Sequence, residues 1–205
     1  MIDEVSSPVV TEVTGPIAIV RFNRPAQRNP LSLGVLQELR LTTSALFPRD
    51  DIQAVIFTGT DDIFLSGANI GELAQLDTET ALEFSKLGQE LFQTIAEARQ
   101  VTIAAINGYC MGGGLDLALA CDIRVASESS TFSHPGARLG VITGWGGTQR
   151  LPRIIKKAAA LDLMLTARRI TSDEALALGL VTHVCDSPLQ HATKVARTSR
   201  KPSIR

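Results

Sequence analysis

The sequence predicts an α/β fold, in which short strands alternate with helices along a single chain. Three observations lead to this class. Turn residues separate two β-rich runs near the N-terminus, apolar runs typical of buried strands occur at residues 52–58 and 101–106, and a long helical pattern lies between those runs. With 205 residues, of which 44% are hydrophobic and 20% charged, the chain is long enough to bury one core of ordinary composition.

The first half of the chain divides into two strands, a helix, a strand and a second helix. Residues 9–22 are expected to form a hairpin around the turn residues 14–16. Ser32 is a suitable N-cap for a helix that ends near Pro48. The strand at 52–58 follows, and then the longest helix. That helix, residues 80–99, gathers its large apolar side chains on one face, namely Phe84, Leu87, Leu91 and Ile95.

The second half repeats the alternation of strands and helices. Strands are predicted at 101–106, 123–126 and 181–184, and helices at 115–121, 151–166, 172–177 and after Pro188. We expect a break in the second of these helices near Pro152, because proline lacks the N–H that a helix interior needs. Residues 54–73 and 101–120 share one order of elements: a buried strand, a glycine-containing turn and a helix.

Charge and cysteine content exclude several classes of protein. The net charge of -1, from 20 Lys+Arg and 21 Asp+Glu, is unlike the basic balance of a nucleic-acid-binding protein. Cys110, Cys121 and Cys185 form no CxxC pair, so neither a disulfide framework nor a zinc site is expected. Residues 1–4 are acidic where a signal peptide is basic, and the longest uncharged run, 100–115, is too short for a membrane span. We therefore expect a cytoplasmic protein with no nucleic-acid partner, no membrane association and no bound metal.

Two glycine-containing turns form the first candidate site. One is residues 66–70 (Ser-Gly-Ala-Asn-Ile), and the other is residues 112–114 (Gly-Gly-Gly). A helix N-terminus presents unpaired backbone N–H groups, and glycine lets the backbone approach a ligand closely. If the preceding strands are neighbours, these N–H groups can converge on one oxygen and form an oxyanion hole, which stabilises charge that develops on a carbonyl. Turns of this kind also serve packing alone, and that alternative stays open here.

Several other chemical motifs do not occur in the sequence. It contains no GxxxxGK[ST] phosphate loop, no G-x-G-x-x-G after residue 106, no GxSxG nucleophile turn and no HExxH zinc helix. His134, His183 and His191 lack metal-ligand spacing, and each is expected at the surface or satisfied by hydrogen bonds. His134 lies in a turn near the candidate site and stays a minor candidate for a functional role.

Four segments, taken together, resemble signatures of the enoyl-CoA hydratase/isomerase (crotonase) superfamily. They are residues 63–70 (IFLSGANI), 105–122 (AINGYCMGGGLDLALACD), 144–152 (GWGGTQRLP) and 175–181 (ALALGLV). The resemblance implies a crotonase-like spiral of ββα units over residues 1–187, with 188–205 as the start of a C-terminal helical segment that is largely absent. It also implies an acyl-CoA thioester substrate, no cofactor apart from the coenzyme A of that substrate, and a homo-oligomer, either a trimer or a hexamer.

The resemblance implies catalytic roles for three positions. The thioester oxygen is expected between the backbone N–H groups of Ala68 and Gly113, where an enolate forms. Asp116 is expected to act as acid/base, although it is one methylene shorter than the glutamate usual in the family; a capping or packing role is the alternative. Hydration of a double bond needs a second proton-transfer group as well. Gly136 stands where the hydratases carry that second carboxylate.

The implied substrate-binding residues surround these positions. They are Arg28, Ala68, Asn69, Ile70, Gly71, Gly113, Gly136 and Trp145. The alternatives are that Arg28 meets a phosphate of coenzyme A or is a plain surface arginine, and that Trp145, the one tryptophan, walls the acyl pocket or serves packing alone.

The function implied by the resemblance is that of an enoyl-CoA hydratase or isomerase of fatty acid metabolism, a lyase or isomerase that stabilises a thioester enolate. Because the second carboxylate is missing, another reaction of the superfamily is an alternative, either decarboxylation or ring closure of the naphthoate-synthase type. A third alternative is a paralogue that binds CoA thioesters without turnover, since a fold by itself does not fix function.

Overall fold

The computed structural model describes residues 7–199 and 201, so the acidic residues 1–4 and the last four residues of the predicted C-terminal segment lie outside the described part. Six strands form the main sheet, in which the first two strands pair antiparallel and the others pair parallel. In spatial order the strands are β1 (Val9–Thr14), β2 (Ile17–Phe22), β4 (Ala54–Thr58), β7 (Val101–Ile106), β9 (Ile123–Ala126) and β12 (His183–Val184).

Two smaller sheets stand beside the main one. The four-stranded sheet has the order β11 (Ile170–Thr171), β10 (Thr131–Ser133), β8 (Tyr109–Met111) and β5 (Ile63–Leu65), and a two-stranded sheet joins β3 (Pro30–Leu31) to β6 (Gly67–Ala68). Strands β4, β7 and β9 of the main sheet are each followed along the chain by a strand of the four-stranded sheet, and then by helical structure. The predicted spiral of ββα units is thereby confirmed.

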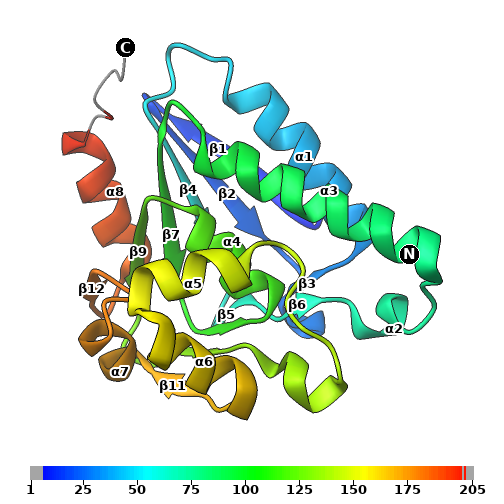
Figure 1. The fold of residues 1–205 in the computed structure, drawn as a ribbon. Coiled ribbons are helices and arrows are strands. Elements are labelled where there is room, and N and C mark those ends of the chain that lie inside the picture. The colour runs from blue at the N-terminus through cyan, green and yellow to red at the C-terminus, as the bar shows by residue number, and fades with distance from the viewer. Residues whose placement is uncertain (1–6, 200, 202–205) are drawn as a thin grey trace.

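Helices cover both faces of the main sheet (Figure 1). The larger core lies under α1, α3 and α4, whereas α8 packs on the opposite face through Ala192 and Ala196, against strands that include β4 and β7. The helices are α1 (Leu33–Leu46), α2 (Ile70–Leu73), α3 (Thr78–Ala96), α4 (Gly113–Ala120), α5 (Gly147–Ile155), α6 (Lys157–Thr166), α7 (Ser172–Ala177) and α8 (Pro188–Thr198), with 3-10 turns at Pro25–Gln27 and Pro135–Leu139.

Local sequence signals account for the helix boundaries in the first half. Ser32 caps α1 as predicted, because its side-chain oxygen accepts the backbone N–H of Val35 at 3.2 Å. Helix α3 starts two residues earlier than predicted, since Asp77 and Thr80 form a reciprocal capping box there. Its buried face matches the predicted stripe, with Phe84, Gly88, Leu91, Phe92 and Ile95 all inside the core.

The predicted helix over residues 151–166 is two helices, and the predicted break at Pro152 is wrong. Helix α5 passes through Pro152, and the chain turns instead at Lys156, whose φ of 70° is left-handed. Leu151 and Ile155 are buried on either side of the proline. Their burial holds this stretch helical although proline removes one backbone hydrogen bond. The last predicted strand is also shorter than expected, because only His183–Val184 pairs with β9.

Candidate active site

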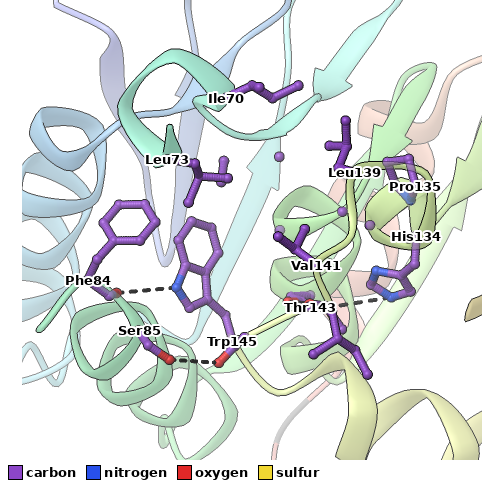
Figure 2. Close-up of a pocket in the computed structure, with 18 of the residues that line it drawn as sticks. Ile70, Leu73, Phe84, Ser85, His134, Pro135, Leu139, Val141, Thr143 and Trp145 are labelled. Carbon is purple, nitrogen blue, oxygen red and sulfur yellow. Dashed lines mark hydrogen bonds and ion pairs between the residues drawn. The ribbon is translucent and has the colours of Figure 1, made fainter. Parts of the chain in front are cut away.

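A cavity of about 320 Å³ opens between α3, the start of α4 and the loop that follows the Pro135–Leu139 turn. Its walls are mostly apolar. Figure 2 shows Leu73, Phe84 and Trp145 on one side, facing Leu139 and Val141 on the other. Asp116 and His134 also line the cavity, and they are its titratable side chains within the described part of the chain. An apolar pocket with a few polar groups is typical of a small-molecule site.

The two glycine-containing turns meet at this cavity. Strands β4 and β7 are parallel neighbours, which was the condition for convergence set out above. Gly67 and Gly112 both have positive φ, at 96° and 52°, in a region that side chains rarely adopt. A Cβ on Gly67 would lie 3.0 Å from the amide nitrogen of Gly113, so the two turns pack backbone to backbone. The condition for convergence is therefore met, and the two turns pack against each other at the cavity.

The backbone amides of Ala68 and Gly113 belong to these two turns, and both residues line the cavity. Gly113 is the first residue of α4, so its N–H has no acceptor within the helix. A Cβ built on Gly113 would lie 3.5 Å from the amide nitrogen of Ala68, and both residues line the cavity. The same Cβ would overlap the ring of Trp145. The close approach of amides and ring thus depends on the missing side chain at this position.

Asp116 lies one helical turn beyond Gly113 and is fully buried. Its Oδ2 accepts a hydrogen bond from the Thr143 hydroxyl. Burial raises the pKa of the Asp116 carboxyl to about 7, against the lowering effects of Thr143, the Trp145 backbone and the charge of Arg150. The Asp116 side chain thus reaches across to the Thr143 loop and lines the cavity.

His134 follows β10 and occupies the other side of Asp116. Its side chain, labelled in Figure 2, is 4% exposed, and its Nε2 lies 3.6 Å from Oδ1 of Asp116. Within the described residues, neither ring nitrogen of His134 nor Oδ1 of Asp116 has a hydrogen-bond partner. Burial lowers the pKa of the His134 imidazole to about 4. The prediction of a surface or satisfied histidine is wrong here, because the chain folds this turn into the cavity wall.

The family model described as enoyl-CoA hydratase/isomerase matches residues 12–201, most of the chain. The chain belongs to the enoyl-CoA hydratase/isomerase family. It is 37% identical over 188 residues to the short-chain-enoyl-CoA hydratase of Clostridium acetobutylicum, a match that covers 91% of this chain and 72% of that protein. It is also 37% identical to the crotonyl-CoA hydratase of Syntrophomonas wolfei, over 86% of this chain and 68% of that one.

Solved structures of enoyl-CoA hydratases share the fold. The enzyme from Bacillus anthracis superposes with a TM-score of 0.89 at 34% identity, over 93% of this chain and 76% of that one. The enzyme from Thermoplasma volcanium gives a TM-score of 0.90 at 30% identity, over 96% of this chain and 79% of that one. The crotonase-like architecture expected from the sequence is therefore confirmed.

In this family member, Trp145 both packs and walls the cavity. It is 4% exposed, its ring centroid lies 5.1 Å from that of Phe84 and 5.7 Å from that of Phe92, and its Nε1 donates to the Phe84 carbonyl at 3.3 Å. Gly88 leaves the space that the ring fills. The sequence left open whether Trp145 packs in the core or walls the cavity, and this side chain does both.

Gly136 lines the cavity in a way that excludes a side chain. A Cβ there would lie 2.5 Å from the Val141 carbonyl oxygen, closer than Cβ atoms come to backbone. A carboxylate at Gly136 therefore needs a different path of the loop around Val141. The observed conformation of the loop at Val141 thus requires glycine at position 136.

Of the remaining predicted binding residues, one lines the cavity and three lie outside its lining. Ile70 lines it and is 61% exposed, whereas Arg28, Asn69 and Gly71 do not line it. Asn69 caps α2, since its side chain accepts the N–H groups of Gly71 and Glu72. Arg28 is exposed, and its carbonyl accepts the Ser66 N–H at 3.1 Å, which ties its loop to the first glycine turn.

The remaining sequence expectations concern metal sites, cysteines, surface histidines and membrane spans. In the described residues no group of three His, Cys, Asp or Glu side chains is placed to hold a metal ion. Cys110 and Cys121 are buried, and burial raises the pKa of both thiols, that of Cys121 to about 12. His183 is exposed and its ring contacts that of His191, so the surface expectation for His183 is confirmed. Across the described helices, none is both long and apolar enough to cross a membrane.

Sequence reasoning missed the contact between Thr143 and Asp116, which makes Thr143 a further candidate for a functional role. Thr143 lies in the loop that begins at Val141, 27 residues after Asp116 in the chain. Its hydroxyl donates a hydrogen bond to the Asp116 carboxylate. A threonine beside a glycine-rich turn carries no distinctive sequence signal. Its role becomes visible through the contact between the 141–145 loop and α4.

Proposed function

We propose that the chain acts on acyl-CoA thioesters and holds the thioester oxygen between the backbone N–H groups of Ala68 and Gly113. The observation that supports this proposal is the close packing of the two glycine turns, which places Ala68 and Gly113 in the wall of one apolar cavity. Two fixed N–H donors aimed at a carbonyl oxygen stabilise the negative charge that forms there when the thioester becomes an enolate. Coenzyme A enters as part of the substrate, and no further cofactor is needed for this step.

Asp116 is the acid/base of the proposed reaction. It is one helical turn from Gly113 and lines the same cavity, so its carboxyl group can approach the carbons next to the thioester. Burial places its pKa at about 7, where a carboxyl group both gives and takes a proton readily near neutral pH. These properties favour a chemical role over the capping role that the sequence left open.

The proposed reaction is hydration of a short 2-enoyl-CoA. One water adds across the double bond, so that its oxygen bonds to the β-carbon and a proton bonds to the α-carbon, and no other reactant is consumed. The names of the two relatives, short-chain-enoyl-CoA hydratase and crotonyl-CoA hydratase, support a short acyl chain. Isomerisation of the double bond uses the same enolate and the same acid/base.

The test is incubation with crotonyl-CoA in heavy water, followed by mass spectrometry of the thioester. Addition of the elements of D2O supports hydration, and deuterium incorporation without addition supports isomerisation. Loss of CO2 from malonyl-CoA without any change in crotonyl-CoA would assign decarboxylation instead. An unchanged but tightly bound thioester would assign the binding paralogue and overturn the proposal.

A pair of variants links the activity to the cavity. Asp116→Asn is expected to lower turnover by at least about 100-fold, the usual contribution of a general acid/base. Asp173→Asn is the matched control, because Asp173 is an exposed carboxylate in the first turn of α7. Equal activity of the two variants would contradict the role given to Asp116.

Assembly into trimers or hexamers and a cytoplasmic location stay predictions. Light scattering coupled to gel filtration tests the oligomeric state.

A further inference from the structure

Adding water across a double bond moves two protons at different places: one leaves the water, and one reaches the α-carbon. If one group is to take the first proton while another gives the second, two titratable side chains must face the substrate. In the cavity, within the described residues, those two side chains are Asp116 and His134. The position of Gly136 is closed to a side chain by the Val141 carbonyl.

Backbone contacts of the strand that precedes His134 hold this residue beside Asp116. Strand β10 pairs with β8, and the Gly112 N–H donates to the Ser133 carbonyl at 2.9 Å. This bond ties the residue before His134 to the residue before α4. His134 is thus positioned against the helix start that carries the Gly113 amide and Asp116.

Gly147 provides the room for the pair. A Cβ on Gly147 would overlap Oδ1 of Asp116, and would lie 2.7 Å from the Thr143 methyl and 3.0 Å from Cε1 of His134. Three side chains therefore converge on one glycine. The polar atoms of the pair that lack partners, Oδ1 of Asp116 and the two ring nitrogens of His134, are buried at this point. Buried polar groups without hydrogen bonds are costly, which makes them candidates for contacts with a substrate or its water.

We propose, on the basis of the function proposed above, that His134 is the second proton-transfer residue of the site. Nε2 of His134 takes a proton from the water whose oxygen bonds to the β-carbon. Asp116 gives its proton to the α-carbon as the enolate collapses. The proton on His134 then passes to Asp116, whose Oδ1 is 3.6 Å away, and this transfer restores the starting state. One water is consumed and the two side chains end as they began.

The burial of the pair fits this division of roles. Besides burial, the Thr143 hydroxyl, the Trp145 backbone and the charge of Arg150 lower the pKa of Asp116, whereas the pKa of His134 is set by burial alone. The charge of Asp116 in turn raises the pKa of the Cys110 thiol. Burial favours the neutral form of both partners, so between pH of about 4 and about 7 the carboxyl group carries the proton and the imidazole has a free lone pair. A neutral resting pair also avoids an uncompensated buried charge. The carboxyl group is therefore the acid and the imidazole the base.

The experiment compares two reactions that need different numbers of proton-transfer groups. Hydration of crotonyl-CoA needs both residues, whereas exchange of the α-proton of butyryl-CoA with D2O at pH 8 needs the ionised Asp116 and the two amides. His134→Gln is expected to lose at least about 100-fold in hydration and to keep butyryl-CoA exchange within about threefold. Asp116→Asn loses both reactions. His183→Gln is the control, because His183 is exposed and does not line the cavity.

A second variant covers the case in which glutamine disturbs the fold. His134→Ala leaves a space in which added imidazole can act as the base, so imidazole is expected to restore hydration in this variant and to leave the wild type unchanged. Circular dichroism and thermal unfolding check that each variant is folded.

The outcomes separate the two proposals. Hydration by His134→Gln within threefold of the wild type would overturn the role of His134. Loss of hydration and exchange together in folded His134→Gln, with no rescue of His134→Ala, would make His134 a positioning residue for Asp116 and overturn the inference. A wild type inert in both reactions would overturn the proposed function, and the inference with it.

Discussion

The Trp145 ring occupies the space that a side chain on Gly113 would need. Trp145 is held in that place by Phe84 and Phe92, which belong to α3. The amide at the start of α4, the wall of the cavity and the long amphipathic helix are therefore one packed unit. Any atom added at Gly113 must move either the ring or the amide.

The first prediction is that Gly113→Ala loses activity and stability together. Overpacking against the ring costs about 1–3 kcal/mol of unfolding free energy. Displacing one of the two amides costs about 100-fold or more in turnover of crotonyl-CoA. The control is Gly34→Ala, in α1, where a Cβ would meet Ser32 Oγ at 3.9 Å. Alanine is the better helix residue, so this control is expected to stabilise the protein by about 0.5–1 kcal/mol. Thermal unfolding and steady-state kinetics measure both effects.

The second prediction is that Gly136→Glu does not create a more active hydratase. The added Cβ would lie 2.5 Å from the Val141 carbonyl oxygen, so the loop must shift. We expect a loss of about 1–3 kcal/mol in unfolding free energy and no gain in kcat. Gly136→Ala separates the two causes, because it adds the Cβ without the carboxylate and should be destabilised in the same way. A rise in kcat for the glutamate variant would show that the loop accommodates a second carboxylate.

The third prediction concerns the hydrogen bond from Thr143 to Asp116. This bond lowers the pKa of Asp116, opposing the effect of burial. Thr143→Val removes the donor, so the pKa of Asp116 rises above about 7. Because the proposed mechanism needs a protonated Asp116, the alkaline limb of the pH profile of kcat/KM moves to higher pH. Thr143→Ser keeps the hydroxyl and should keep the limb in place. An unchanged limb in Thr143→Val would mean that another group controls it.

The fourth prediction is that the two partners of the buried pair affect stability with opposite signs of pH dependence. Folding raises the pKa of Asp116 to about 7. The free energy of unfolding that the protonated carboxyl group contributes is therefore present below the ordinary pKa and is lost as pH rises through about 7. Asp116→Asn cannot ionise, and its stability relative to wild type should increase between pH of about 4 and about 7. The gain is on the order of 4 kcal/mol.

The pKa of His134 is lowered by folding to about 4, so the stability of its neutral form is present above the ordinary value and lost as pH falls through about 4. His134→Gln should therefore gain stability relative to wild type as pH falls from about 6.5 to about 4, by on the order of 3 kcal/mol. Urea unfolding at a series of pH values measures both curves. Parallel curves for wild type and either variant would show that the residue does not titrate in these windows.

Local sequence signals were sufficient for most elements of the fold. The cap at Ser32 and the buried face of α3 depend on side chains three or four residues apart, which a sequence pattern displays directly. The break at Pro152 was predicted from the same kind of local rule and was wrong. Burial of Leu151 and Ile155, a tertiary effect, outweighed the local preference and moved the break to Lys156.

For the candidate site, the sequence by itself determined the two glycine turns, the acid one turn after Gly113, and the family that their order indicates. It did so because turns, helix starts and helical spacing are properties of neighbouring residues. The tertiary structure alone decided that His134 lies against Asp116, that Thr143 reaches the same carboxylate, and that Val141 closes the position of Gly136. These contacts join segments that are distant in the chain and are brought together by strand pairing and loop packing, and burial of this kind sets the pKa values on which proton transfer depends.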